Sequence, residues 1–471
     1  MSLESFLVHL ANKYFGPKPP KPRGRDLVLG KTMVYDREEP VILRESARTM
    51  HLAVMGGTGV GKSYFLENLI RQDIAHGTGF AVFDVHGDLA ENIVMYLAER
   101  ARERKEILDR IVIIEPFDET HTIGFNPLER SKHTSAFLQA QELAHILRLR
   151  WQKQSFGPRT EEVLRSALYT LSACGLTLLE LPELLTNGAF RRTLIREIGE
   201  KAVTDYWRGR YDPLSEAMQA QVREPLLTRV SAFLADPQVR EIVGQRKSTF
   251  TFAEAIQKSL WVVINLSKGI LGRENAEVLG SLLFTKLELD VLGQARIQES
   301  KRKLFAVYAD ELQNLVGAKL ATLIAEGRKY RLSLTGGHQY WRQLSPEMRA
   351  AMLGVGSRLI FRVSYQDARG LAGELDPRGK ERLAEELPTL ERGQAIFRTG
   401  LEGAVKLQVE KHDKAKSRSE DIERVRVHSR KNYGTNRSEI RKDIEGRFRE
   451  GAQERIGELK KEGEAEAIDN Q

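Results

Sequence analysis

The 471-residue chain has little cysteine and no long apolar run. Its single cysteine, Cys174, excludes an internal disulfide framework and fits a reducing cytoplasm. No window approaches the ~20 consecutive apolar residues that a membrane span requires. Residues 1–16 lack the basic start and apolar core of a signal peptide. Metal-ligand spacing is also missing, so no structural zinc is predicted. We therefore expect a cytoplasmic protein with no integral membrane segment.

Composition is informative about size and partners. A hydrophobic content of 41% supports globular cores, and the length suggests two or three domains at roughly 150 residues each. The formal net charge of +8 is compatible with nucleic-acid binding without demonstrating it.

The most specific motif is the octapeptide GGTGVGKS at residues 56–63. It follows a short apolar run at 51–55 and precedes a helical pattern at 64–70, which is the strand–loop–helix setting of a phosphate-binding loop. Backbone N–H groups of such a loop surround a polyphosphate beside a helix N-terminus. We predict that Lys62 reaches the β- and γ-phosphates of ATP and that the Ser63 hydroxyl binds Mg²⁺. The predicted nucleotide contacts are Gly56, Gly57, Thr58, Gly59, Val60, Gly61, Lys62, Ser63 and Tyr64.

A second motif supplies carboxylates. The apolar run at 304–309 ends in Asp310 and Glu311. We predict that Asp310 lies at Mg²⁺ and that Glu311 is the general base for the water that attacks the γ-phosphate. Gln339, after the next predicted strand, is a candidate sensor of the γ-phosphate. Asp84 follows another strand, where it either influences Mg²⁺ or forms an ordinary turn.

The order of patterns predicts an α/β fold, a RecA-like P-loop domain with a mainly parallel sheet, because apolar runs alternate with helical segments. The predicted strands cover 51–55, 80–84, 110–114, 260–265, 304–309, 332–335 and 358–362, with hairpins within 27–43 and 394–409. Residues 132–247 show helical periodicity and no strand pattern. This stretch is therefore predicted to be an inserted all-α domain. The predicted parts are an N-terminal helix and Pro-rich connector (1–26), the ATPase domain (27–131 and 248–410), the all-α domain (132–247) and a charged, helical C-terminal tail (411–471). We expect the tail to be partly disordered or to order only on a partner.

Taken as a set, these motifs resemble the HerA–FtsK superfamily of ring-forming, DNA-pumping ATPases. Within it, the chain is most similar to conjugative coupling proteins of the TraG/TraD kind, in a form without transmembrane helices. The resemblance covers about Leu27 to Val409. It rests on the loop with its preceding strand, on DVHGD at 84–88, on FNPL at 125–128, on ADELQN at 309–314, on Gln339 and on 354–362. Membrane-bound coupling proteins begin with transmembrane helices, and none is predicted in this sequence. Any docking on a membrane channel would therefore be peripheral.

The resemblance implies ATP and Mg²⁺ as cofactors, DNA as the substrate and a homohexamer. It also implies that a relaxase or other DNA-processing protein docks on the all-α domain. An arginine would reach into the neighbouring subunit's site, where its charge stabilises the transferred phosphoryl group. Arg358 is the first candidate for this catalytic role, followed by Arg362 and Arg328.

The function predicted from the sequence is an ATP-dependent DNA translocase that moves DNA in conjugative or type IV secretion-like transfer. Two alternatives stay open. The first is a HerA-like helicase or pump in DNA end processing or defence. The second is an ATP-gated scaffold that recruits DNA–protein complexes, against which Glu311 argues because a pure switch needs no general base.

Overall fold

The computed structural model describes residues 19–130, 135–151, 157–315, 320–339, 344, 346–400 and 403–449. Most of the predicted N-terminal helix and connector, and the tail from residue 450 onward, lie outside these ranges. Within them, no helix has the length and apolar content needed to cross a membrane.

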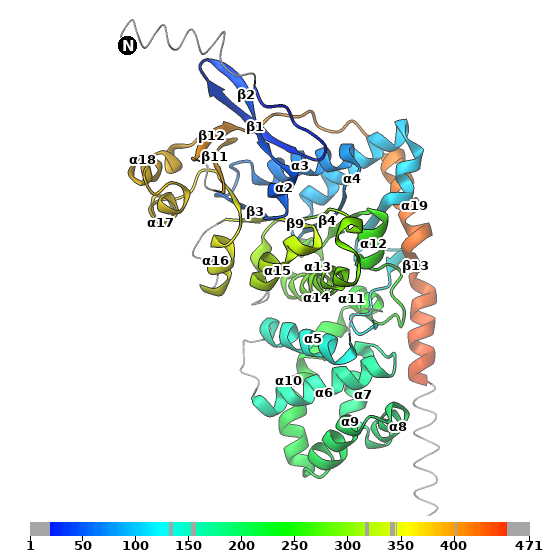
Figure 1. Cartoon of the computed structure of the whole chain (residues 1–471). Helices are drawn as coiled ribbons and strands as arrows, with labels where there is room; N and C mark the ends of the chain where they lie inside the picture. The colour runs from blue at the N-terminus through cyan, green and yellow to red at the C-terminus, as the bar shows by residue number, and fades with distance from the viewer. Residues whose placement is uncertain are drawn as a thin grey trace, which may run out of the picture.

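An eleven-stranded sheet forms the centre of the protein, in the order β2-β1-β12-β11-β10-β3-β9-β8-β4-β7-β5 (Figure 1). Neighbouring strands are parallel from β10 to β5 and antiparallel from β10 to β2. The strands are β1 (Leu27–Val34), β2 (Arg37–Leu43), β3 (Leu52–Met55), β4 (Gly79–Asp84), β5 (Ile111–Ile114), β7 (Trp261–Asn265), β8 (Phe305–Ala309), β9 (Leu332–His338), β10 (Ser357–Ile360), β11 (Gln394–Thr399) and β12 (Val405–Gln408). A separate two-stranded sheet pairs β6 (His121–Ile123) with β13 (Gly434–Asn436).

Alternate side chains of the parallel strands enter two different cores. Phe80 and Val82 of β4 belong to the apolar cluster that contains α3 and α4, whereas Ala81 and Phe83 belong to the cluster that contains α14. Continuous apolar runs are what a parallel sheet covered on both faces requires. The helices associated with this sheet are α2 (Glu45–Arg48), α3 (Lys62–His76), α4 (Asp88–Glu103), α12 (Phe252–Lys258), α13 (Lys268–Leu271), α14 (Arg273–Leu292), α15 (Leu320–Glu326), α16 (Pro346–Leu353), α17 (Tyr365–Leu375) and α18 (Lys380–Glu386). The predicted fold class is confirmed.

Two strands end away from their predicted positions: β10 ends at Ile360 instead of residue 362, and β9 is longer than predicted. The sequence places the end of this strand at Thr335, but β9 continues through Gly336 and Gly337 to His338. A Cβ at Gly336 would lie 2.5 Å from the Leu312 side chain, and a Cβ at Gly337 would lie 3.1 Å from Asp310 Oδ1. The two glycines are therefore strand residues that allow a close approach of β8's carboxyl end, rather than a turn.

A group of helices lies between β6 and α12 in the chain and forms a body beside the sheet (Figure 1). Several begin at a side-chain cap: Ser135, Asn187, Ser215 and Asp236 each accept a hydrogen bond from a first-turn N–H group. These helices are α5 (Ala136–Arg150), α6 (Pro158–Ala173), α7 (Leu181–Thr186), α8 (Gly188–Ile198), α9 (Lys201–Tyr206), α10 (Glu216–Ala235) and α11 (Pro237–Val243).

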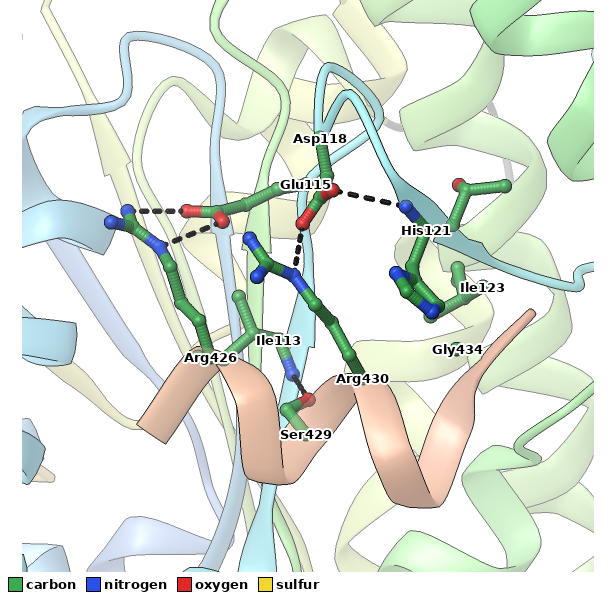
Figure 2. A pocket seen from close by; sticks show the side chains of 10 residues that line it. Ile113, Glu115, Asp118, His121, Ile123, Arg426, Ser429, Arg430 and Gly434 are labelled. Atoms are coloured by element: carbon green, nitrogen blue, oxygen red, sulfur yellow. Dashed lines mark hydrogen bonds and ion pairs between the residues drawn. The ribbon is translucent and has the colours of Figure 1, made fainter. Parts of the chain in front are cut away.

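The C-terminal segment packs on the rest of the chain as far as Arg447, which contacts Glu180 and Gly244. Helix α19 (Ser419–Tyr433) lies along β5, where the Arg426 guanidinium pairs with Glu115 at 3.0 Å and Arg430 Nε pairs with Asp118 at 2.5 Å (Figure 2). Ser429 Oγ accepts a hydrogen bond from Ile113 N at 2.9 Å. A cavity of about 20 Å³ remains between these side chains, too small for more than water.

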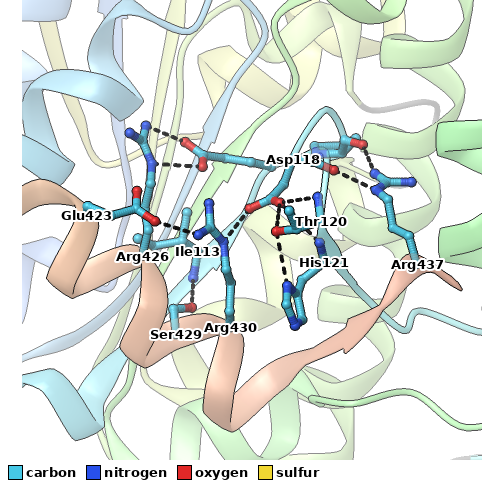
Figure 3. A network of polar contacts seen from close by, with 11 residues as sticks. Ile113, Asp118, Thr120, His121, Glu423, Arg426, Ser429, Arg430 and Arg437 are labelled. Carbon is cyan, nitrogen blue, oxygen red and sulfur yellow. Dashed lines mark hydrogen bonds and ion pairs between the residues drawn. The ribbon is translucent and has the colours of Figure 1, made fainter. Parts of the chain in front are cut away.

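Beyond α19, β13 pairs with β6, and residues 437–449 are helical. Arg437 donates a hydrogen bond to Asp118 O (Figure 3). It also forms an ion pair with Glu241 of α11. Residues 419–449 are therefore ordered on the same chain, although the sequence suggested that the tail is partly disordered or orders only on a partner. Their arginines meet acids of the same chain, a pairing that composition does not reveal.

A fully buried polar network joins β8 to helices α2 and α3. Arg48 of α2 makes two hydrogen bonds, of 2.8 and 2.6 Å, to the carboxylate of Asp73 on α3. Tyr308 of β8 donates a third to the same carboxylate at 2.6 Å. This network joins the helix that follows the glycine-rich loop to the strand that precedes Asp310.

Candidate nucleotide site

The glycine-rich loop connects buried β3 to the start of α3. Gly59 and Gly61 have φ values of 74° and 114°, which side-chain-bearing residues rarely adopt. At Gly56 a Cβ would lie 2.6 Å from Phe361 Cβ, so the loop also needs glycine for close packing. Helix α3 has no side-chain cap and no acidic residue in its first turn. Its first N–H groups and its dipole thus favour an anion at this point.

Lys62 lies over this loop. Its Nζ donates hydrogen bonds to Gly56 O at 2.6 Å and to Gly57 O at 2.8 Å. Burial lowers the pKa of the Lys62 ammonium, while the carboxylates of Asp310 and Glu311 act in the opposite direction. Both of these hydrogen-bond acceptors are neutral carbonyl oxygens, so an incoming phosphate would add a charge-assisted partner for the buried ammonium.

The predicted Mg²⁺ ligands meet in the structure. Ser63 Oγ donates a hydrogen bond to Asp310 Oδ2 at 2.8 Å, although the two residues are 247 positions apart in the chain. A hydroxyl and a carboxylate are oxygen donors of the kind that Mg²⁺ prefers, and Mg²⁺ usually completes its shell with phosphate and water oxygens. These two side chains therefore fit the ion that the motif implies.

Glu311 takes part in a series of side-chain hydrogen bonds. Its Oε1 accepts from Gln339 Nε2, and its Oε2 accepts from Gln313 Nε2. Gln339 Oε1 in turn accepts from Thr58 Oγ1, at 3.1 Å, in the glycine-rich loop. Glu311 also has a φ of 57°, a left-handed conformation that costs a non-glycine residue energy and is typical of functional sites. The predicted base and sensor thus contact each other, and the sensor contacts the loop.

Asp84 has a structural role in this arrangement. Its carboxylate accepts hydrogen bonds from His86 N at 2.8 Å and Ala90 N at 3.0 Å, which holds the turn into α4. Burial raises the pKa of Asp84, whereas these backbone hydrogen bonds act to lower it. The turn interpretation of this motif therefore has direct support.

The three candidate arginines lie at different places. Arg358, on β10, is half-buried and donates a hydrogen bond to Leu353 O, and burial lowers the pKa of its guanidinium. Arg362 is exposed just after β10, and its carbonyl accepts a hydrogen bond from Gly57 N of the loop at 2.9 Å. Arg328 is exposed in the short 3-10 helix η7 (Gly327–Tyr330).

Two parts of the site were missed by sequence reasoning. Gln313 stands two residues after Glu311 and gave only a weak signal, namely its place in the ADELQN segment. His412 lies in the charged tail, yet its ring stacks on that of Tyr64 at a centroid distance of 4.0 Å. Nothing in the local sequence around residue 412 points to the glycine-rich loop.

Fold and site together define a P-loop ATPase of the RecA-like type. Residues 27–269 match the family model described as the central domain of helicase HerA. This stretch is more than half of the chain, and the chain belongs to that family.

Solved structures of similar fold include the plasmid coupling protein TrwB in complex with the GTP analogue GDPNP. It has a TM-score of 0.56 and 18% identity, over 86% of this chain and 98% of that one. The structure of TrwB with ADP and Mg²⁺ has a TM-score of 0.56 and 18% identity, over 85% of this chain and 98% of that one. VirB4 of Thermoanaerobacter pseudethanolicus has a TM-score of 0.53 and 16% identity, over 84% of this chain and 98% of that one. None of the curated proteins matches the chain significantly.

Proposed function

We propose that this protein hydrolyses ATP with Mg²⁺ to move DNA, as a homohexameric translocase of the conjugative coupling type. The observation that carries the proposal is the hydrogen-bonded series from Thr58 through Gln339 to Glu311, beside the Ser63–Asp310 contact. A loop that binds phosphate is connected in this way to the group that activates water. TrwB, which shares the fold, was solved with ADP and Mg²⁺ and with analogues of ATP and GTP.

The proposed division of labour follows from the site. Lys62 and the N–H groups of the loop bind the phosphates, Ser63 and Asp310 hold Mg²⁺, and Glu311 accepts the proton of the attacking water. In the arrangement described, both Glu311 oxygens accept amide hydrogen bonds. A phosphate that draws Gln339 toward the loop would release one of these oxygens for the water. Hydrolysis would then respond to γ-phosphate binding.

DNA and the ring are further parts of the proposal. The positive net charge and the family support DNA as the substrate. We assign residues 27–131 and 248–410 to the motor, residues 132–247 to a body that receives a relaxase or other partner, and 411–471 to the tail. Arg358 is the proposed residue that completes the neighbouring site. The single cysteine supports a reducing, cytoplasmic location.

A HerA-like pump that acts in end processing or defence is the second candidate, because the matching family model is that of helicase HerA. The two candidates share a motor and differ in their partner proteins. Affinity capture from the native cell, with Glu311→Gln to hold the nucleotide-bound state, should recover a relaxase for the first candidate and a nuclease for the second.

Triplex displacement along duplex DNA tests translocation itself. The parent protein should displace the third strand when ATP is present, and Glu311→Gln should not. DNA should also stimulate ATP hydrolysis, and binding should weaken steeply with salt because phosphate contacts release counterions. ATP hydrolysis that is indifferent to DNA at low salt, together with no displacement, would contradict translocation and favour the recruitment scaffold.

A further inference from the structure

The strand order determines which flank of the glycine-rich loop is left for a nucleoside. The loop follows β3, which lies between β9 and β10 in the sheet. Gln339, Asp310 and Glu311 follow β9 and β8, on one flank of the loop. In the proposed function this flank receives the γ-phosphate. Because the nucleoside is at the opposite end of the phosphate chain, it belongs on the flank of β10, β11 and β12.

Residues 409–413, after β12, run along that flank. Gly393 joins them to the loop, since Gly393 N donates to Val60 O at 3.0 Å and Gly393 O accepts from Val409 N at 2.9 Å. From α3, Arg71 Nη1 donates to Asp413 O at 2.9 Å and Asn68 Nδ2 donates to Glu410 O at 3.4 Å. These bonds are exposed to solvent, so the segment is attached to α3 by contacts that water can replace.

The ring of His412 lies on the ring of Tyr64, the residue that directly follows Ser63. Their centroids are 4.0 Å apart and their planes differ by 6°. Tyr64 Oη donates to His412 O at 2.9 Å and accepts from His412 N. The side chain of His412 is 15% exposed, and its Nε2 lies 3.8 Å from Glu67 Oε1. Among the described residues this nitrogen has no hydrogen-bond partner. A flat nitrogen heterocycle thus already rests on an aromatic ring beside the loop.

We propose that the Tyr64 ring is the platform for the nucleobase and that His412 occupies this platform when no nucleotide is bound. The proposal rests on the nucleotide binding proposed for the loop. Tyr64 also packs against the buried apolar cluster that contains Phe65. The base therefore takes the ring face that His412 covers, and residues 410–413 lift away from α3.

The ligand class is a nucleoside di- or triphosphate, with no selection among the bases. Stacking on an aromatic ring accepts any base, because every base has a π-face. Adenine and guanine nucleotides are thus expected to bind with affinities that differ by less than about fivefold. Residues 410–413 continue into α19, so base binding would also move the start of the segment that lies along α4 and β5.

Calorimetric titration with two probes separates the base from the phosphates. Mg²⁺-ADP reports on the whole site, whereas inorganic tripolyphosphate reports on the loop alone. Tyr64→Ala is expected to weaken ADP binding about tenfold, within the range for base–aromatic stacking, and to leave tripolyphosphate binding unchanged. His412→Ala is expected to tighten ADP binding about threefold, because the ring that competes with the base is removed. Tyr64→Phe keeps the ring and serves as the matched control, with ADP affinity at least equal to that of the parent.

Each alternative result has a distinct meaning. If Tyr64→Ala binds tripolyphosphate normally and ADP within twofold of the parent, the platform is refuted while phosphate binding at the loop stands. If His412→Ala weakens ADP binding, His412 does not occupy the place of the base, and the proposal is overturned. If the parent binds neither probe, the proposed function fails and this inference fails with it. Should Tyr64→Ala fail to fold, the sign of the change in His412→Ala still decides.

Discussion

The buried ion pair between Arg48 and Asp73 gives the sharpest prediction for stability. Both side chains are 0% exposed, and the pair has two hydrogen bonds of 2.8 and 2.6 Å. Tyr308 adds a third to the same carboxylate. Asp73 raises the pKa of Arg48 although burial alone would lower it. Arg48→Met leaves Asp73 in the core without its cation, and breaking a buried pair in this way costs about 3–5 kcal/mol.

Urea unfolding, followed by the fluorescence of Trp261 and the other tryptophans, measures this cost. A second variant, Arg48→Met with Asp73→Leu, removes both charges and should be clearly more stable than the single variant, because no unpaired buried charge remains. Lys258→Ala is the control, since its partner Glu254 and Lys258 itself are 36% and 64% exposed, and its unfolding midpoint should not change measurably. An Arg48→Met midpoint equal to that of the control would refute the reasoning, as would a double variant less stable than the single one.

Three further predictions concern the site and its surroundings. Lys62→Ala should abolish nucleotide binding, whereas Glu311→Gln should bind nucleotide and lose turnover; equal rates of phosphate release for Glu311→Gln and the parent would contradict the assignment of the base. Arg358→Ala should keep nucleotide affinity and lower turnover by a factor on the order of 10³, and mixing it with Glu311→Gln should restore part of the activity. If the mixed rings assemble and bind ATP but recover no activity, the same test should be applied to Arg362 and Arg328. Acidification should destabilise the fold between about pH 6.5 and pH 4, because burial lowers the pKa of His51 and of His338 to about 4 and the unfolded chain takes up these protons first. His51→Gln should make the loss of stability with falling pH shallower in unfolding curves at each pH.

Contiguous motifs made much of this site predictable from the sequence. The glycine-rich loop carries its own strand, turn and helix within residues 51–70, so local residues determine both its conformation and its chemistry. Asp310 and Glu311 end a continuous apolar strand, and parallel strands have their carboxyl ends at one edge of the sheet. The Ser63–Asp310 contact follows from these two facts.

Contacts between segments that are distant in the sequence were harder to predict. Tyr64 and His412 are 348 residues apart, and neither the period of the helix nor that of the strand relates them. The contact of the Gln339 amide with Glu311 depends on where β9 ends. That end lies three residues beyond its prediction, because Gly336 and Gly337 have the composition of a turn and the packing of a strand.

The tail shows most clearly why composition alone was insufficient. Its residues suggest disorder because apolar side chains are few, and a segment that buries little apolar surface cannot offset the entropy of ordering. That argument treats the segment as isolated. In the chain, acids on other elements receive the tail's arginines: Arg426 meets Glu115, Arg430 meets Asp118 and Arg437 meets Glu241. Apolar contacts accompany them, because Val425, Ile440 and Ile444 are buried. Whether a charged segment is ordered therefore depends on how its charges match the acidic residues of the surface that it covers, and not on its own composition alone.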